Sequence, residues 1–212
     1  MTWVSYAQNY EDVTLRRALR DVSSGFYVDV GANDPRVDSV TRAFYERGWH
    51  GINIEPVAHW HDRLQADRPR DINLRVAAGP VAGAMRLHEV VGTGLSTADP
   101  RLARRHAREG HAVHAFEVPV RRLDDILDEF DPPAVHFLKV DVEGAEPGVL
   151  QGMALTRRRP WIVVIEAVRP GTQSASHRTW EPLLVSRDYQ FAWFDGLNRF
   201  YVAREHADLI PA

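Results

Sequence analysis

Acidic side chains follow short apolar stretches at four places in the sequence. These stretches are "VDVGAND" with Asp29, "INIEP" with Glu55, "KVDVEG" with Asp141 and Glu143, and "VVIEA" with Glu166. A carboxylate is costly to bury without a partner, so a sheet built only for stability would seldom end four strands in acid. One such acid is commonly a helix N-cap or a partner of the helix dipole, but four of them together with a glycine loop favour a ligand site.

The loop "DVGANDP" indicates which kind of ligand this site takes. It contains one glycine, Gly31, and lacks the G-x-G-x-x-G pattern that lets a helix N-terminus approach a pyrophosphate. The acids on its two sides, Asp29 and Asp34, would repel a diphosphate and suit a ligand with ammonium and sulfonium charges. Glu55 follows at the spacing where nucleotide-binding βαβ units place the acid for the ribose hydroxyls. Together these features predict S-adenosylmethionine.

Strand and helix patterns alternate along most of the chain, and they determine where the acids lie. Strands are expected at residues 26–30, 51–56, 72–79, 135–142 and 160–167, and helices at residues 8–20, 39–48, 58–69, 146–153 and 179–188. Residues 189–204 are typical of an aromatic-rich hairpin, and residues 81–122 contain two alternating stretches around a short basic helix. This order predicts an α/β fold in which ligands bind at the carboxyl ends of parallel strands.

Composition limits the alternatives. The 212 residues are 44% hydrophobic, which is enough for one substantial core, and there is no cysteine for a disulfide or a thiolate metal site. The net charge of −3, spread along the chain, gives no support for nucleic-acid binding. No apolar run is long enough for a membrane span and no secretory signal follows Met1, so we expect a cytoplasmic protein without a membrane partner.

Several segments in order resemble the FkbM-type methyltransferases, which are S-adenosylmethionine enzymes of the class I fold. They are "GFYVDVGANDPRVDSVT", "FYERGWHGINIEP", "FLKVDVEGAEPGVLQG", "WIVVIEA" and "FDGLNRFYV". The resemblance implies one domain over residues 1–212, with an N-terminal helical cap at 1–24 and a lid or acceptor insert at 81–122. It also implies a Rossmann-like sandwich: a mostly parallel seven-stranded sheet, helices on both faces, and a C-terminal antiparallel hairpin.

The resemblance further implies an O-methyltransferase that acts on a hydroxyl of a sugar or natural-product small molecule. A non-catalytic cofactor-binding or partner-binding module on the same scaffold is one alternative, although it predicts a damaged glycine loop or missing acids. Methylation of nitrogen or of nucleic acid is another, and "DVEG" stands where a nucleic-acid enzyme would need an "NPPY"-like motif. The oligomeric state stays open, with a homodimer as one option.

Roles for single residues follow from the same resemblance. Asp141 would face the cofactor or a metal, and Ser96 and Thr97 match a polar loop whose role is open. The residues implied in cofactor binding are Gln8, Glu11, Asp12, Asp29, Gly31, Asn33, Glu55 and Asp141.

An alkyl hydroxyl is a poor nucleophile at neutral pH and needs a base or a metal ion. Asp141, Glu143 and Glu166 form an all-oxygen set that suits Mg²⁺, although Glu143 and Glu146 would equally orient the helix that follows them. His177, in the loop at residues 168–180, is the preferred general base, with an exposed loop histidine as the alternative.

Lys139 is the only lysine in the chain and shares a strand face with Asp141. It would orient the acceptor, act as a base if burial lowers its pKa, or form an internal ion pair without a part in the chemistry. Among the catalytic candidates His177, Asp141 and Lys139, it is therefore the one with the strongest structural alternative.

Two further groups invite weaker interpretations. The spacing of His106, His111 and His114 in an irregular basic stretch is poor support for a zinc site. Aromatic residues of the closing hairpin are expected in the sheet core, whereas Asp195 and Asn198 at its turn would reach a substrate. The aromatic residues are Trp193, Phe194, Phe200 and Tyr201.

Overall fold

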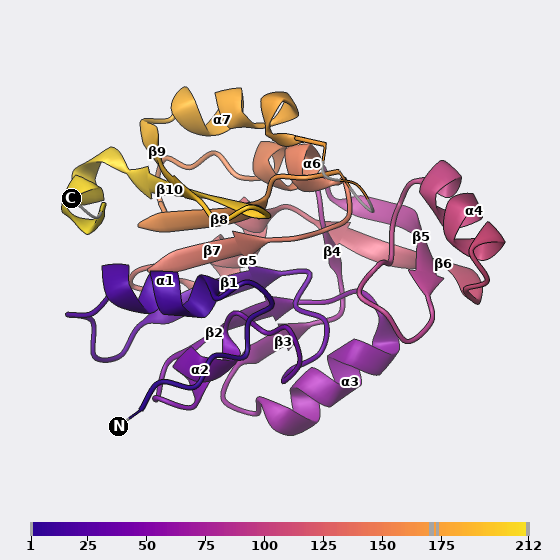
Figure 1. Ribbon diagram of the computed structural model, residues 1–212, viewed down its shortest axis with the longest axis horizontal. Helices are drawn as coiled ribbons and strands as arrows, with labels where there is room; N and C mark the ends of the chain where they lie inside the picture. The colour runs from indigo at the N-terminus through magenta and orange to yellow at the C-terminus, as the bar shows by residue number, and fades with distance from the viewer. Residues whose placement is uncertain (1, 170–171, 173, 211–212) are drawn as a thin grey trace.

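Seven strands form the central sheet in the order β3-β2-β1-β7-β8-β10-β9 (Figure 1). The computed structural model describes residues 2–169, 172 and 174–210. Strands β1, β2, β3, β7 and β8 are parallel, and β10 is antiparallel to both β8 and β9. The predicted mostly parallel sheet with a closing antiparallel hairpin is confirmed. The strands are β1 (Phe26–Val30), β2 (His50–Ile54), β3 (Ile72–Leu74), β7 (Phe137–Val140), β8 (Ile162–Glu166), β9 (Tyr189–Phe194) and β10 (Asn198–Ala203).

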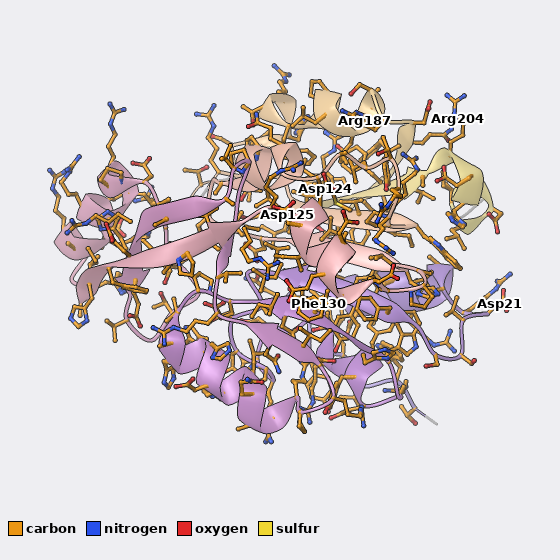
Figure 2. The ribbon with its side chains drawn as sticks, turned by 180° about the vertical axis from the view of Figure 1, so that it is seen from behind. Asp21, Asp124, Asp125, Phe130, Arg187 and Arg204 are labelled. Carbon is orange, nitrogen blue, oxygen red and sulfur yellow. The ribbon has the colours of Figure 1, made fainter. Side chains whose placement is uncertain are left out.

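Helices cover both faces of this sheet, because its strands are apolar on both sides. On one face α1 (Glu11–Ala18) and α2 (Arg42–Tyr45) pack Leu15 and Phe44 against Tyr27 and Phe137. On the other face lie α5 (Leu123–Phe130), α6 (Glu146–Gln151) and α7 (Glu181–Val185). Figure 2 shows the molecule from behind, with Asp124, Asp125 and Phe130 of α5 labelled.

Residues 77–121 build a second, three-stranded sheet at one end of the molecule (Figure 1). Its order is β4-β6-β5, and Trp60 and Leu87 join it to the main body in a small apolar cluster. The single strand expected at 72–79 is therefore wrong: the chain leaves the main sheet after Leu74, and Ala77 pairs with Val120 instead. The elements are β4 (Ala77–Ala78), β5 (Gly83–Val90), α4 (Pro100–Arg108) and β6 (Val113–Arg121), with α3 (Ala58–Asp67) beside them.

Helix α5 was not expected, although its pattern is visible in the sequence. Leu123, Ile126, Leu127 and Phe130 follow helical spacing, and Asp124 and Asp125 stand in the first turn. The helix expected at 179–188 is short and follows a 3₁₀ turn, His177–Thr179, and a second 3₁₀ segment, Arg204–Leu209, follows β10. None of the helices in the described ranges has the length and apolar character needed to cross a bilayer.

In the closing hairpin most of β10 is buried, and most of β9 is exposed. Phe200 and Tyr201 of β10 are buried as expected, whereas Trp193 and Phe194 are 54% and 45% exposed. The expectation of core positions for Trp193 and Phe194 is wrong because β9 is the outermost strand of the sheet, with a neighbour on one side only.

Candidate active site

A cavity of about 340 Å³ opens at the carboxyl ends of β1, β2, β7 and β8. The strand order reverses between β1 and β7, and ligands of open α/β sheets bind at this switch point. The cavity walls include Gly31, Asn33, Glu55, Lys139, Asp141, Glu143 and Glu166, so most of the predicted residues meet in one place.

Gly31 fits its position because no other residue would. It has φ of +77°, and a Cβ atom built on it would lie 1.9 Å from the backbone oxygen of Asp141. The next polar residue of the loop, Asn33, also has positive φ, and its side-chain oxygen is buried without a hydrogen-bond partner among the described residues. The loop after β1 therefore brings its backbone close to β7 and places Asn33 in the cavity wall.

Lys139 binds this loop to the sheet. Its ammonium donates to the Gly31 carbonyl at 2.7 Å and lies 3.3 Å from Asp29 and 3.6 Å from Asp141. Burial alone would lower the pKa of Lys139, but Asp29 and then Asp141 outweigh it, and the pKa lies above its ordinary value. Lys139 is therefore held in its charged form, which contradicts a role as base and matches the ion-pair interpretation.

Asp29 stands behind the cavity rather than in its wall. Its side chain is 2% exposed, faces Lys139 across the β1–β7 pair, and accepts a hydrogen bond from Thr41 at 3.0 Å. An acid inside a buried strand is stabilised by such partners. Asp29 therefore approaches the cavity only through Lys139, which it holds beside the Gly31 carbonyl.

Glu55 lies at the end of β2 and is 5% exposed. Its two carboxylate oxygens accept backbone N–H groups, from Val57 at 2.8 Å and from Asn33 at 2.9 Å. Burial raises the pKa of Glu55 to about 7 against the lowering effect of these two hydrogen bonds. The carboxylate is thereby fixed in orientation at the cavity wall, with further lone pairs available to a ligand hydroxyl.

Three acids gather on the β7–β8 side of the cavity. Burial, then the negative charges of Asp141 and Glu146, raise the pKa of Glu143 to about 8. Burial and the charges of Asp141 and Glu143 place the pKa of Glu166 well above its ordinary value. One oxygen of Glu143 and one of Glu166 are buried without a hydrogen-bond partner among the described residues. This side of the cavity can accept a hydrogen bond or a proton.

The predicted magnesium site is not formed by these side chains. In the described part of the chain, three ligand atoms lie within 4.8 Å of one another in one group only, which is His106, Glu109 and His111. Mg²⁺ holds its oxygen ligands about 2.1 Å from the ion, and the oxygens of Asp141, Glu143 and Glu166 are not all within 4.8 Å of one another as the side chains stand. Glu146 stands in the first turn of α6 and accepts the Gly144 N–H at 3.0 Å, which matches the alternative that it orients this helix.

The N-terminal segment reaches the cavity through one residue. Gln8 lines it, whereas Glu11 and Asp12 are buried behind it. Glu11 accepts hydrogen bonds from Asn198 at 2.7 Å and from the Asn9 N–H at 2.8 Å, and Asp12 accepts the Ser5 hydroxyl at 2.6 Å. These acids hold the segment in place, and of the three cap residues predicted to bind the cofactor only Gln8 lies in the cavity wall.

Of the remaining predicted residues, some belong to the cavity and one does not. Ser96 lines the cavity, and Thr97 donates to the Glu143 carbonyl at 3.2 Å, so their loop belongs to the site. His177 does not line the cavity: it faces Glu181 at 4.0 Å, and burial and Arg199 lower its pKa. Residues 170, 171 and 173 of the loop at 168–180 lie outside the described residues.

The hairpin turn approaches the cavity without the two residues expected there. Asn198 is held by Glu11, and the Asp195 backbone carbonyl accepts a hydrogen bond from Asn9 at 2.9 Å. Leu197, between them in sequence, lines the cavity.

An apolar wall was missed by the sequence interpretation. Trp60 of α3 and Met85 and Leu87 of β5 line the cavity on the side of the second sheet. The Trp60 indole donates to the Thr93 carbonyl at 3.3 Å, which fixes its ring. Trp60 stands in the first turn of α3, shortly after Glu55 in the sequence, and this was the available signal. Strand β5 comes near only through the tertiary fold.

Both the sequence and the fold of the chain match known proteins. A family model for the methyltransferase FkbM domain matches residues 29–191. A methyltransferase FkbM from Methylobacillus flagellatus KT has a similar fold, with 18% identity and a TM-score of 0.53 over 85% of this chain and 44% of that chain. The chain thus spans less than half the length of that relative.

An O-methyltransferase from Bacillus cereus, solved in complex with SAH, aligns over 95% of this chain and 84% of its own. Its identity is 9% and its TM-score is 0.44. No curated protein sequence matches the chain significantly.

Proposed function

The chain belongs to the FkbM methyltransferase family, and from this premise we propose that it moves a methyl group from S-adenosylmethionine to a small-molecule hydroxyl. The observation that carries the proposal is the cavity at the switch point, with Glu55 in its wall on one side and the acids Asp141, Glu143 and Glu166 in its wall on the other. A sugar or natural-product acceptor follows from the family resemblance alone.

The cofactor would occupy the β1–β2 side of the cavity. When bound, it supplies an electrophilic methyl group on sulfur. Glu55 accepts hydrogen bonds from the ribose hydroxyls, and the Gly31–Asn33 loop faces the methionine end. Trp60 and Leu87 offer the apolar surface that an adenine ring requires.

The acceptor hydroxyl would meet the acids of the β7–β8 side. A general base works best when its pKa is near the working pH, and the pKa of Glu143 is about 8. Glu143 and Glu166 line the cavity, and each has an unpartnered oxygen among the described residues. We therefore assign the removal of the acceptor proton to this pair of carboxylates in place of His177, with Asp141 as the neighbouring charge.

The segments around the cavity receive roles by their position. Residues 1–24 form a cap that contributes Gln8 and fastens to the hairpin turn through Glu11. The insert at residues 81–122 contributes Met85, Leu87 and Ser96 to the walls. Because such insertions vary between enzymes of one fold, we assign acceptor recognition to this insert within a single domain.

Calorimetry with S-adenosylhomocysteine tests the proposal. We expect one saturable site, and a thermal unfolding midpoint that rises with ligand concentration. An acceptor screen with S-adenosylmethionine, followed by mass spectrometry, should then detect a gain of one methylene in a hydroxylated compound. Absence of binding, with a chain that is folded by circular dichroism, would contradict the assignment of the cofactor.

A further inference from the structure

The carboxyl end of α4 brings together three side chains that can bind a metal ion. Each of His106, Glu109 and His111 offers a ligand atom, and these atoms all lie within 4.8 Å of one another. The helix lies at one end of the molecule beside β5 and β6 (Figure 1). None of the three side chains lines the cavity of the proposed active site, so the group is separate from it.

The backbone itself creates this proximity. Helix α4 ends in a Schellman motif: the Gly110 N–H donates to the Ala107 backbone carbonyl at 3.2 Å, and the His111 N–H donates to the His106 backbone carbonyl at 3.1 Å. Gly110 has φ of +95°, as this turn requires. The motif folds the residue after the glycine back onto the last turn, where an apolar pair usually forms. Here that pair is His106 and His111, with ring centroids 5.9 Å apart.

His106 is the fixed member of the group. It is 2% exposed, and neither ring nitrogen has a hydrogen-bond partner among the described residues. Its Nδ1 lies 3.3 Å from a carboxylate oxygen of Glu109, so a ring nitrogen faces the proposed site. A buried polar group without a partner is unusual in native proteins and requires an explanation.

Two imidazoles and one carboxylate are the ligand set of several zinc sites, with a fourth position open to water. Glu109 and His111 are exposed, so they can rotate toward His106 and close the ligand spacing to the roughly 3.3 Å that zinc bonds of about 2.0–2.1 Å require. The negative end of the helix dipole also favours a cation here. Arg105 pairs with Oε1 of Glu109 at 3.0 Å, which leaves Oε2 toward His106.

We propose that His106, Glu109 and His111 bind one Zn²⁺ ion. The ion ties the last turn of α4 to the segment that leads into β6, within the insert that borders the active site. His114 belongs to the same basic stretch but lies on β6 outside the group. The spacing of the three histidines was poor support for zinc, since one ligand of the proposed site is a glutamate.

Calorimetric titration of Zn²⁺ into the chelator-treated full chain, without a histidine tag, tests the proposal. We expect one ion per chain and a higher thermal unfolding midpoint. The variant His111→Ala, which changes an exposed side chain, should weaken the affinity by at least about tenfold and abolish the thermal shift. Glu109→Gln should act in the same direction.

His114→Ala is the matched control, because it removes an exposed histidine of the same stretch and should bind Zn²⁺ like the unchanged chain. Glu166→Gln should also leave the affinity unchanged, which separates this group from the acids of the cavity. Absence of one-to-one binding would overturn the proposal, as would a His111→Ala variant that binds as tightly as the unchanged chain.

Discussion

Glu143 and Glu166 combine two properties that a structural acid would not need. Both line the cavity, and both have raised pKa values because they are buried beside other carboxylates. Folding does not gain from such an arrangement, since each ionisation adds charge to an acidic and poorly solvated place. Perturbed groups of this kind cluster at functional sites, which is the reason for assigning them to proton removal.

Substitution of these acids tests that assignment. We expect Glu143→Gln and Glu166→Gln each to lower kcat by about 10²–10⁴-fold, the range for loss of a general base. The base must be ionised, so kcat of the unchanged chain should rise with pH through about 8 and then level off. In Glu143→Gln the midpoint of this rise should shift or the rise should disappear. Measured pH–rate profiles decide this, with Asp208→Asn as the control, because Asp208 is exposed and does not line the cavity. Profiles that coincide in all variants would exclude both acids.

Glu55 should affect cofactor binding and local structure together. The variant Glu55→Gln loses a charged acceptor and presents an amide donor to the Asn33 or Val57 N–H. We expect S-adenosylhomocysteine to bind about 10–100-fold more weakly, the loss that one charge-assisted hydrogen bond produces. Calorimetry with an analogue that lacks the ribose hydroxyls is the control: its affinity should hardly change. An equal loss for both ligands would assign Glu55 to loop geometry alone.

At the scale of elements, the loop after β1 depends on close contact with β7. Lys139 connects the Gly31 carbonyl, Asp29 and Asp141, so the two central strands share one charged link at their carboxyl ends. The sequence placed these residues on neighbouring strand ends, but the distances that make Lys139 a cation rather than a base arise only when β1 and β7 pair.

A pair of glycine variants separates close contact from backbone strain. Gly31 and Gly92 have similar φ values, +77° and +74°, so alanine strains the backbone at both. Only Gly31→Ala places a Cβ atom against the Asp141 carbonyl, since nothing lies within 4 Å of the Cβ position at Gly92. We expect Gly92→Ala to cost about 1 kcal/mol and Gly31→Ala clearly more, with loss of ligand binding. Urea unfolding and calorimetry measure the two effects; equal costs would contradict the close contact.

At the scale of the molecule, the acids of the cavity should make stability depend on pH. Glu55, Glu143 and Glu166 have folded pKa values above the ordinary 4.5, so the folded chain holds their protons more tightly than the unfolded chain. The free energy of unfolding should therefore fall as pH rises from about 4.5 to about 8, because these acids must give up protons that the folded chain holds more tightly. Lys139, whose folded pKa is raised above 10.5, stabilises the fold throughout this range.

Removing one acid should reverse part of that loss. At pH 8, we expect Glu166→Gln to unfold about 2–4 °C higher than the unchanged chain, the shift that about 1 kcal/mol produces in a domain of this size. At pH 5 the two midpoints should approach each other, because Glu166 is then protonated and neutral. Calorimetric scans across pH test this, with Glu117→Gln as control. A difference that stays constant with pH would contradict a raised pKa for Glu166.

The sequence by itself determined the order of elements, the parallel sheet, the closing hairpin and most of the cavity residues. Apolar runs, loop glycines and strand-end acids are local features, and parallel strands necessarily bring their carboxyl ends to one edge. Helix α5 was equally readable from its apolar spacing and was overlooked.

Only the tertiary structure decided what individual side chains can do. Glu11, Asp12 and Asp29 match the motif in sequence, yet their carboxylates are held by neighbours behind the cavity. His177 lies outside the cavity wall, and the oxygens of Asp141, Glu143 and Glu166 are not gathered within 4.8 Å of one another, because both depend on packing between distant segments. Trp60 of α3 and Leu87 of β5 pack in one apolar cluster for the same reason, although they are distant in sequence. Burial and charge at such meeting points set each pKa, and no single stretch of sequence contains them.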